Sequence, residues 1–516
     1  MFFKGRLTKI ACGALHGVDA FRVDLEVDFS RAGLPAFTMV GLAEGAVREA
    51  RDRVFTALRN GNFRLPPARI TVNLAPADRK KGGSSYDLPL AVGLLSSAGM
   101  LPQENIEGYF LTGELSLTGA VKPVSGVLPL AILARDQGAT GILVPTANAL
   151  EAAVVEGLAV YGIESLGQAA AFFAGQITIE PQRPLAAGEY AGERDDFHLD
   201  FADVKGQELA KRAVEIAAAG GHNLLFLGPP GSGKTMLAQR MATVLPPLSF
   251  EESLQVSKIY SVAGLLSSGR GIMEERPFRA PHHTISEFGL VGGGAYPRPG
   301  EVSLAHRGVL FLDELLEFRK QTLEVLRQPL ENGSVTIARA AQSVSYPADF
   351  MLLAAMNPCP CGYLNDSRKT CTCSQSDIQR YRSRLSGPLL DRIDLHVEVP
   401  TVPYEDLRSE LPGKSSGDIR KTVEAARALQ AERFHKSRGK CNADLSGREF
   451  ERHCRLDHAG HAFLRDAVNN LRLSARAYTR ILRIARTVAD LDGKAAIAAM
   501  HLAEAVNCRA LDRLHA

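Results

Sequence analysis

The chain contains 516 residues, enough for two to four domains with sizeable cores. Hydrophobic residues make up 45% and charged residues 23% of it, and the net charge of +3 excludes a molecule that binds polyanions over its whole surface. No apolar run approaches the length of a membrane span, and residues 1–7 lack the apolar core of a signal peptide. We therefore expect a cytoplasmic protein without a membrane partner.

The first 180 residues mix strand and helix patterns and form the first predicted domain. Strands are expected where apolar and polar residues alternate or where short apolar runs occur, at residues 8–12, 21–28, 70–74, 110–119 and 142–145. Helices are expected where apolar residues recur with helical spacing, at residues 46–60, 88–97 and 131–137. This mixture predicts an α+β domain.

The order of these elements resembles the proteolytic domain of Lon-type proteases, an α+β fold shared with ribosomal protein S5. The resemblance includes the family's turns, which fall here at Gly113-Glu114, Gly119 and Gly126. A polar stretch over residues 181–199, with proline, glycine and mixed charge, then predicts a linker.

Lon-type proteases use a Ser–Lys dyad, and this chain departs from it. The serine position falls near Asp87 and the lysine position at Leu128, although Ser84, Ser85 and Lys122 lie close in sequence. A serine without a base is a weak nucleophile. We expect a degenerate domain that acts as a scaffold or docking unit and not as an active protease.

A phosphate-binding loop opens the second predicted domain, residues 200–403. Every fixed position of G-x-x-x-x-G-K-[ST] is matched by the segment Gly228, Pro229, Pro230, Gly231, Ser232, Gly233, Lys234 and Thr235. An apolar strand pattern precedes the loop and a helix pattern follows it, which is the context the motif requires. Backbone N–H groups would cradle the phosphates of ATP, Lys234 would reach the β- and γ-phosphates, and Thr235 would ligate Mg²⁺.

Two acids follow the apolar run at residues 309–312. Because parallel strands present ligand-binding loops at their carboxyl ends, Asp313 is expected to hold Mg²⁺ and Glu314 to act as general base toward water. A solvated helix start would explain such a pair if it stood alone. The upstream loop favours the catalytic interpretation.

Four of the eight cysteines lie in one short segment, as Cys359, Cys361, Cys371 and Cys373. Two C-x-C pairs joined by a short loop predict a closed, structural zinc site, and unliganded thiols are the alternative. His282 and His283 are adjacent in a loop without nearby acidic ligands. We expect them to form hydrogen bonds and not to bind a metal.

Helices are expected at residues 418–434, 461–470, 475–491 and 495–511, and they form a third predicted domain over residues 404–516. The P-loop, the acidic pair, an apolar strand ending at Asn357 and these helices resemble AAA+ ATPases. The predicted fold is therefore multidomain α/β, with a parallel-sheet core and a helical lid. In that family an amide such as Asn357, called sensor 1, orients the attacking water.

The AAA+ resemblance also implies two arginine roles. Arg392, with Arg384 as the second choice, would be the finger that reaches ATP in the neighbouring subunit; a surface ion pair is the alternative. Arg476, or Arg480 one turn away, would be sensor 2 and contact the γ-phosphate of its own subunit. These roles imply a homo-oligomeric ring, for which we expect six subunits.

The three domains in this order resemble the magnesium-chelatase-like AAA+ proteins of the ComM/YifB type. The resemblance implies an ATP-driven motor on DNA, such as a helicase that promotes branch migration when transforming DNA is integrated. Residues 334–346 predict a hairpin with Arg339 near its tip as a candidate DNA phosphate contact, although a solvated residue is equally compatible. A protein-remodelling ATPase and a nucleotide-gated switch without translocation are the other classes considered.

Overall fold

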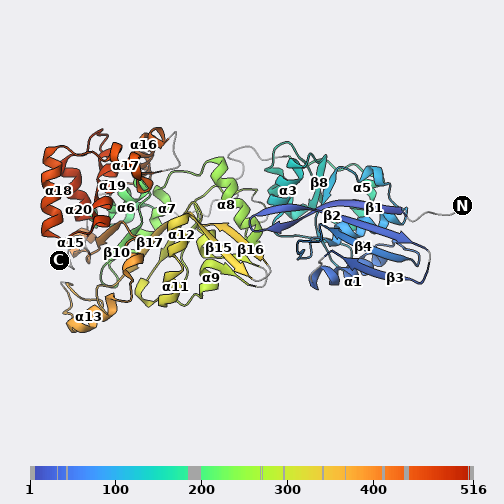
Figure 1. Cartoon of the computed structure of the whole chain (residues 1–516), viewed down its shortest axis with the longest axis horizontal. Helices are drawn as coiled ribbons and strands as arrows, with labels where there is room; N and C mark the ends of the chain where they lie inside the picture. The colour runs from blue at the N-terminus through green and yellow to red at the C-terminus, as the bar shows by residue number, and fades with distance from the viewer. Residues whose placement is uncertain are drawn as a thin grey trace. The chain divides into compact units, whose positions relative to one another are not determined.

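The computed structural model describes the chain apart from residues 1–5, 32, 42–44, 184–198, 268, 270, 295–296, 340–341, 367, 409–412, 435–440, 510 and 512–516. Most of the predicted linker 181–199 lies outside the described residues. The chain divides into two compact units (Figure 1). Unit 1 comprises Met1–Arg194 and Phe250–Glu274, and unit 2 comprises Asp195–Ser249 and Glu275–Ala516. Among the described helices, none is long and apolar enough to cross a membrane.

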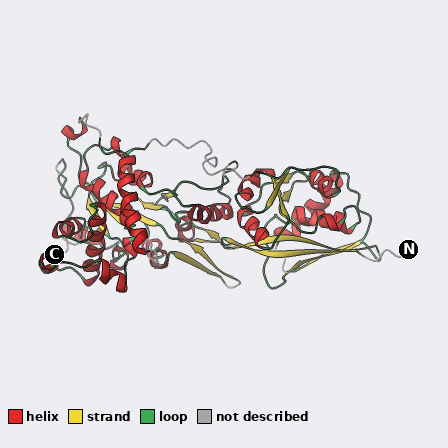
Figure 2. Ribbon diagram, turned by 90° about the horizontal axis from the view of Figure 1, so that it is seen from above, coloured by secondary structure: helices red, strands yellow, loops and turns green. Residues whose placement is uncertain are grey.

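Unit 1 is built on a mixed sheet of seven strands in the order β3-β4-β2-β1-β5-β8-β9. Two long antiparallel strands dominate it, β1 (Arg6–His16) and β2 (Asp19–Ser30), visible as extended yellow ribbons in Figure 2. On the β2 side β4 is antiparallel to β2 and β3 runs parallel to β4, whereas β5, β8 and β9 continue the sheet from β1 in parallel register. Their bounds are β3 (Ala36–Val40), β4 (Arg69–Ala75), β5 (Tyr109–Leu111), β8 (Gly141–Pro145) and β9 (Ala159–Ile163).

Helices cover both faces of this sheet. The larger core joins the sheet to α1 (Gly45–Asn60), α2 (Asp87–Ser97) and α5 (Leu166–Phe173). A second core joins it to α3 (Val127–Asp136) and α4 (Ala149–Ala153). Alternation along β5 explains the division, because Phe110 lies in the second core and Leu111 in the first.

Helix α8 (Phe250–Ala263) belongs to unit 1, although the chain on both sides of residues 250–274 belongs to unit 2. The buried Glu151 carboxylate links α8 to the rest of unit 1. Glu151 accepts hydrogen bonds from the Leu128 amide at 2.9 Å, the Asn148 side chain at 3.1 Å and the Ser261 hydroxyl of α8. Ile272 completes the apolar contact.

The two residues at which the Lon dyad was expected to fall, Asp87 and Leu128, are both buried. Asp87 is the first residue of α2, is fully buried, and receives Arg53 Nε at 2.8 Å and Nη2 at 2.9 Å. Leu128 is a core residue. Ser84 hydrogen-bonds to Glu114, and Lys81 is buried with its ammonium on the carbonyl oxygens of Gly41 and Pro76.

Unit 2 contains a five-stranded parallel sheet in the order β11-β14-β17-β10-β18. The central strands β14 (Val309–Leu312), β17 (Met351–Met356) and β10 (Leu224–Leu227) are buried along their whole length, as expected for parallel strands covered on both faces. The edge strands are β11 (Phe278–Arg279) and β18 (Leu395–Glu398).

The C-terminal helices share one hydrophobic core with this sheet. The core includes sheet residues such as Phe226 and Leu353 together with residues of α16 (Ser416–Phe434), α18 (His458–Asn470), α19 (Ala475–Leu491) and α20 (Ala499–Asn507). Helix α6 (Glu208–Gly220) contributes to the same core. The predicted boundary near residue 404 is therefore not a break in the core of unit 2.

Most expected elements are present, with shifts at their ends. The expected helix at 475–491 coincides with α19, while the helix expected at 495–511 spans only Ala499–Asn507. The expected strand at 110–119 is divided into β5 and the two-residue strand β6 (Glu114–Leu115), which pairs with β7 (Val121–Lys122) just beyond the expected range. Helix α3 begins four residues earlier than expected, directly after the left-handed Gly126.

The Arg53–Asp87 pair generates a stability prediction. Burial raises the pKa of Asp87, and Arg53 offsets that cost by pairing with the charged carboxylate. Arg53→Leu leaves a buried charge without its partner, so we expect a loss of about 3–5 kcal/mol of local stability. Hydrogen exchange of peptides from α1 and α2 measures this loss.

Arg51→Leu is the matched control, because Arg51 lies on the same helix and its guanidinium is exposed over the Phe37 ring. The double variant Arg53→Leu/Asp87→Leu removes both charges and should recover most of the protection. Unchanged hydrogen exchange in Arg53→Leu would contradict a stabilising role of the Arg53–Asp87 pair.

Candidate nucleotide-binding and metal sites

The phosphate-binding motif lies between β10 and α7 (Lys234–Val244). Gly228 has to be glycine, because a Cβ there would lie 2.2 Å from the Val399 carbonyl oxygen. Gly233 precedes the helix with φ +95°, a conformation that favours glycine. The expected strand–loop–helix arrangement is therefore present, and the N-terminus of α7 faces the loop.

A pocket of about 440 Å³ forms around this loop. It brings together residues from three separate strand ends, namely Pro230, Gly231, Ser232, Gly233, Lys234, Thr235, Met236, Asp313, Glu314, Met356 and Asn357. Five residues with predicted catalytic or ligand roles are thus neighbours, although about 120 residues separate the first from the last. The volume lies within the range of small-molecule and cofactor sites.

Lys234 is the buried cation of this pocket. Its ammonium donates to the carbonyl oxygens of Gly228 at 2.7 Å and Pro229 at 2.8 Å, and it lies 3.3 Å from Asn357 Oδ1. Burial lowers the pKa of Lys234, while the charges of Asp313 and Glu314 act in the opposite direction. Lys234 thus connects the loop to the residue that follows β17.

Thr235 and Asp313 place hard oxygen ligands at the pocket. The Thr235 hydroxyl donates to Asp313 Oδ2 at 2.7 Å, and the other carboxylate oxygen accepts the Glu314 amide at 2.8 Å. Hydroxyl and carboxylate oxygens are the donors that Mg²⁺ prefers. The donor set therefore fits a magnesium ion held by these two residues.

Glu314 combines an unusual backbone with an exposed side chain. Its φ of +50° and ψ of +48° lie in the left-handed region, which is uncommon for a residue with a Cβ. The carboxylate is 56% exposed, and its Oε2 lies 3.4 Å from Nδ1 of His283. His283 was expected only to form hydrogen bonds, and no sequence motif signals this contact.

The predicted arginines lie elsewhere in unit 2, and none lines the pocket. Arg392 forms an ion pair with Glu331, and Arg476 forms one with Asp391, the residue that precedes Arg392 in the sequence. Of the second choices, Arg384 donates to the Leu316 carbonyl oxygen at 3.1 Å and Arg480 to the Ile393 carbonyl oxygen at 3.0 Å.

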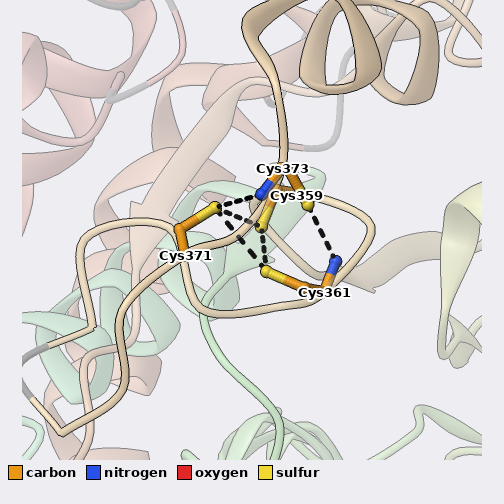
Figure 3. A group of neighbouring side chains, drawn as sticks. All are labelled: Cys359, Cys361, Cys371 and Cys373. Atoms are coloured by element: carbon orange, nitrogen blue, oxygen red, sulfur yellow. Dashed lines mark hydrogen bonds between the residues drawn. The ribbon is translucent and has the colours of Figure 1, made fainter.

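Figure 3 shows the four-cysteine cluster, whose sulfur atoms all lie within 4.8 Å of one another. Cys359 Sγ is 3.3 Å from Cys361 Sγ and 3.6 Å from Cys371 Sγ, and the Cys361 amide donates to Cys373 Sγ at 3.4 Å. Peptide N–H groups, that of Tyr363 first, lower the pKa of Cys361 to about 6. Four convergent soft donors with amide support fit a tetrahedral Zn²⁺.

The cysteine segment packs directly on the phosphate-binding loop. Gly362 follows the second cysteine with φ +84°, and a Cβ on it would lie 2.7 Å from Pro230 Cδ. The Gly362 amide donates to the Cys359 carbonyl oxygen at 3.0 Å. The turn that carries two thiols therefore supports the pocket wall, a contact that the motif spacing does not reveal.

Three family models together match most of the chain. The model described as magnesium chelatase, subunit ChlI, matches residues 200–407; a second model of the ChlI subunit matches residues 25–148; and the ChlI C-terminal model matches residues 413–509.

Full-length relatives agree with these matches. The chain is 46% identical over 502 residues to the uncharacterized protein YifB of Salmonella typhimurium, covering 97% of this chain and 96% of the relative. It is 45% identical over 511 residues to the competence protein ComM of Haemophilus influenzae, covering 97% of each chain. The magnesium-chelatase 67 kDa subunit of Chlorobaculum parvum is 26% identical over 172 residues, or 31% of this chain and 23% of that protein.

A phosphate-binding loop, an Asp-Glu pair and an asparagine around one pocket of a parallel sheet define a P-loop ATPase of the AAA+ class. The chain belongs to the magnesium-chelatase-like ComM/YifB family, which confirms the resemblance stated from the motifs.

The contact between Gly362 and Pro230 predicts an effect on nucleotide affinity. Gly362→Ala adds a methyl group against the loop, and we expect ATP to bind about tenfold more weakly, measured with a fluorescent ATP analogue. Gly493→Ala is the control, because Gly493 has φ +63° and a Cβ there meets no atom within 4 Å. Equal affinity in both variants would contradict a supporting role of the cysteine turn.

Proposed function

We propose that this protein is an ATP hydrolase that works as a ring-shaped motor on DNA. The observation that carries the hydrolase is the gathering of Lys234, Thr235, Asp313, Glu314 and Asn357 around one pocket. In this proposal the loop amides and Lys234 hold the triphosphate, and Thr235 and Asp313 hold Mg²⁺. The bound ion neutralises phosphate charge.

The remaining steps concern the attacking water. Asn357 orients it, and Glu314 accepts its proton while the oxygen attacks the γ-phosphorus and the bond to the β-phosphate oxygen breaks. The backbone N–H groups of the phosphate-binding loop and of the N-terminus of α7 stabilise the negative charge that develops on the leaving group.

Glu314→Gln is expected to keep ATP binding and to lose about two to four orders of magnitude in turnover.

In this proposal the arginine that completes the nucleotide site comes from a neighbouring subunit of an oligomeric ring. Arg392 does not line the pocket of its own chain, and its partner Glu331 is itself exposed, so the pair can separate at low cost. We assign Arg392 as the finger of a neighbouring subunit in a ring, with six subunits as the expected number. Arg476 remains our choice for sensor 2.

Support for DNA as the polymer comes from the family and from one hairpin. The relative from Haemophilus influenzae is named a competence protein. We propose that this chain promotes branch migration of DNA in the cytoplasm. Strands β15 (Ser334–Arg339) and β16 (Gln342–Pro347) form the expected hairpin, with the backbone of Arg339 at its end. The Arg339 side chain lies outside the described residues.

For unit 1 we propose a non-proteolytic scaffold of the Lon-like α+β type. The support is the buried Arg53–Asp87 pair and the core residue Leu128 at the positions that correspond to the dyad.

A panel of DNA structures tests the motor. We expect forked or four-way DNA to raise ATP turnover severalfold, because a motor couples hydrolysis to its track, and Lys234→Ala to abolish turnover with every DNA. The measurement is steady-state phosphate release. If single strands, junctions and duplex leave the rate unchanged while an unfolded protein raises it, the chain is a protein remodeller. If no polymer changes the rate, it is a nucleotide-gated switch.

The cysteine cluster is proposed to hold one structural Zn²⁺ per chain. Elemental analysis of protein purified under reducing conditions should find about one zinc per chain, and Cys371→Ser should lower this content. Cys12→Ser is the control, because Cys12 is a buried thiol of unit 1 outside the cluster. Folded wild-type protein without zinc would remove the metal assignment and leave the nucleotide site intact.

A further inference from the structure

Asn223 immediately precedes β10, the strand that lies between β17 and β18 in the sheet of unit 2. Its side-chain oxygen accepts the Leu352 amide of β17 at 2.7 Å, and its side-chain nitrogen donates to the Arg392 carbonyl oxygen at 2.8 Å. The Asn223 carbonyl oxygen accepts the amides of Asp394 and Leu395, each at 3.0 Å. One residue therefore fixes the backbone from Arg392 to the start of β18.

Three successive carbonyl oxygens of this segment each accept a side-chain donor. The donors to the carbonyl oxygens of residues 392–394 are, in order, Asn223 Nδ2 at 2.8 Å, Arg480 Nη1 at 3.0 Å and Arg509 Nη1 at 2.7 Å. Both arginines are buried and belong to the C-terminal helical part of the chain. Hydrogen bonds from charged donors are stronger than those between neutral groups. The backbone after Arg392 is therefore held from several sides.

The carboxylate of Asp394 adds a further attachment. Its Oδ2 lies 3.3 Å from His222 Nδ1, and its Oδ1 lies 3.4 Å from Arg480 Nε. His222 Nε2 in turn lies 2.8 Å from the Thr487 hydroxyl of α19. Because these contacts come from different parts of unit 2, the Arg392 backbone cannot shift without breaking several of them at once.

The side chain of Arg392 is held less firmly than its backbone. Its Nη2 pairs with Glu331, whose side chain is 41% exposed, and its Nε is buried without a hydrogen-bond partner among the described residues. An ion pair open to water contributes little, and a buried donor without a partner is unfavourable. The guanidinium can therefore change partner while its backbone stays in place.

Asn223 and the phosphate-binding loop lie at opposite ends of β10. Five residue steps of extended chain separate Asn223 from Gly228, a span of about 16 Å. Arg392 precedes β18, which runs parallel to β10, whereas the pocket lies where β10, β14 and β17 end. The Arg392 side chain is too short to cross the sheet to this pocket, so a nucleotide that it contacts belongs to another subunit.

We propose that Asn223 is a positioning residue that fixes the backbone of Arg392, so that the guanidinium reaches the triphosphate bound by the neighbouring subunit. This inference rests on the proposed ATPase function and on Arg392 as its finger. Loss of the bond between Asn223 and the Arg392 carbonyl oxygen misplaces the finger. It leaves the nucleotide site of the same subunit intact.

Asn223→Asp tests this role in the full-length protein, because its carboxylate can still accept the Leu352 amide but cannot donate to the Arg392 carbonyl oxygen. We expect an unchanged affinity for a fluorescent ATP analogue and about ten- to hundredfold lower ATP turnover, the loss expected when a catalytic group is misplaced by about 1 Å. Asn223→Ala removes both bonds without adding a charge and should lose at least as much. Wild-type turnover in both variants would overturn the inference.

Mixed rings separate a finger defect from a general structural one. Glu314→Gln subunits are expected to bind ATP and to carry an intact Arg392, so they can supply the finger to an Asn223→Asp neighbour. In an equimolar mixture, turnover should exceed the sum of the separate variants and approach about a quarter of wild type, because about one interface in four joins an intact site to an intact finger. Arg392→Ala in place of Glu314→Gln is the control, because neither subunit then supplies a competent finger and no rise is expected.

The possible failures have different signatures. A mixture of Asn223→Asp or Asn223→Ala with Glu314→Gln that never exceeds the sum of its parts would overturn the positioning role, since the defect would then lie in the subunit's own site or fold. Wild-type turnover in Arg392→Ala would instead overturn the finger assignment. Wild-type protein without any ATPase activity would overturn the proposed function itself.

Discussion

The parallel register of the five-stranded sheet is the constraint on which the site of unit 2 depends. Leu227 lies opposite Met356, and Leu312 lies opposite Ala354, so three buried strands end close together at one edge. The phosphate-binding loop, the acidic pair and Asn357 each begin where one of these strands stops. A shift of two residues in one pairing would move a catalytic group by about 6–7 Å, more than the pocket tolerates.

Lys234 holds the ends of two of these strands together through its charge. Its buried ammonium is shared by two loop carbonyl oxygens and by Asn357, so the loop and the end of β17 are held by one charge. The cysteine turn begins two residues after Asn357 and returns to Pro230. The nucleotide pocket and the thiol cluster are therefore successive parts of one continuous structure, and neither can be repositioned alone.

Local motifs made the core of the site predictable, whereas contacts between distant segments were not. The P-loop, Asp313, Glu314 and Asn357 all follow apolar strand runs. The first three were selected from short-range pattern, and Asn357 was selected from the AAA+ resemblance. The contacts of His283 with Glu314 and of Gly362 with Pro230 depend on which strands are neighbours, and no local pattern encodes that. Strands β3 and β9 and the placement of α8 were missed for the same reason, because their apolar residues acquire meaning only in the assembled cores.

The discontinuity of unit 1 has a practical consequence for dissecting this protein. The chain passes between the units near residues 194, 249 and 274, and residues 250–274 complete the second core of unit 1. A gene fragment that ends at the apparent linker would lack Ser261 and Ile272, leaving Glu151 and an apolar surface uncovered. The complementary fragment would carry α8 without its binding partner. Modular cloning at that boundary would divide a folding unit.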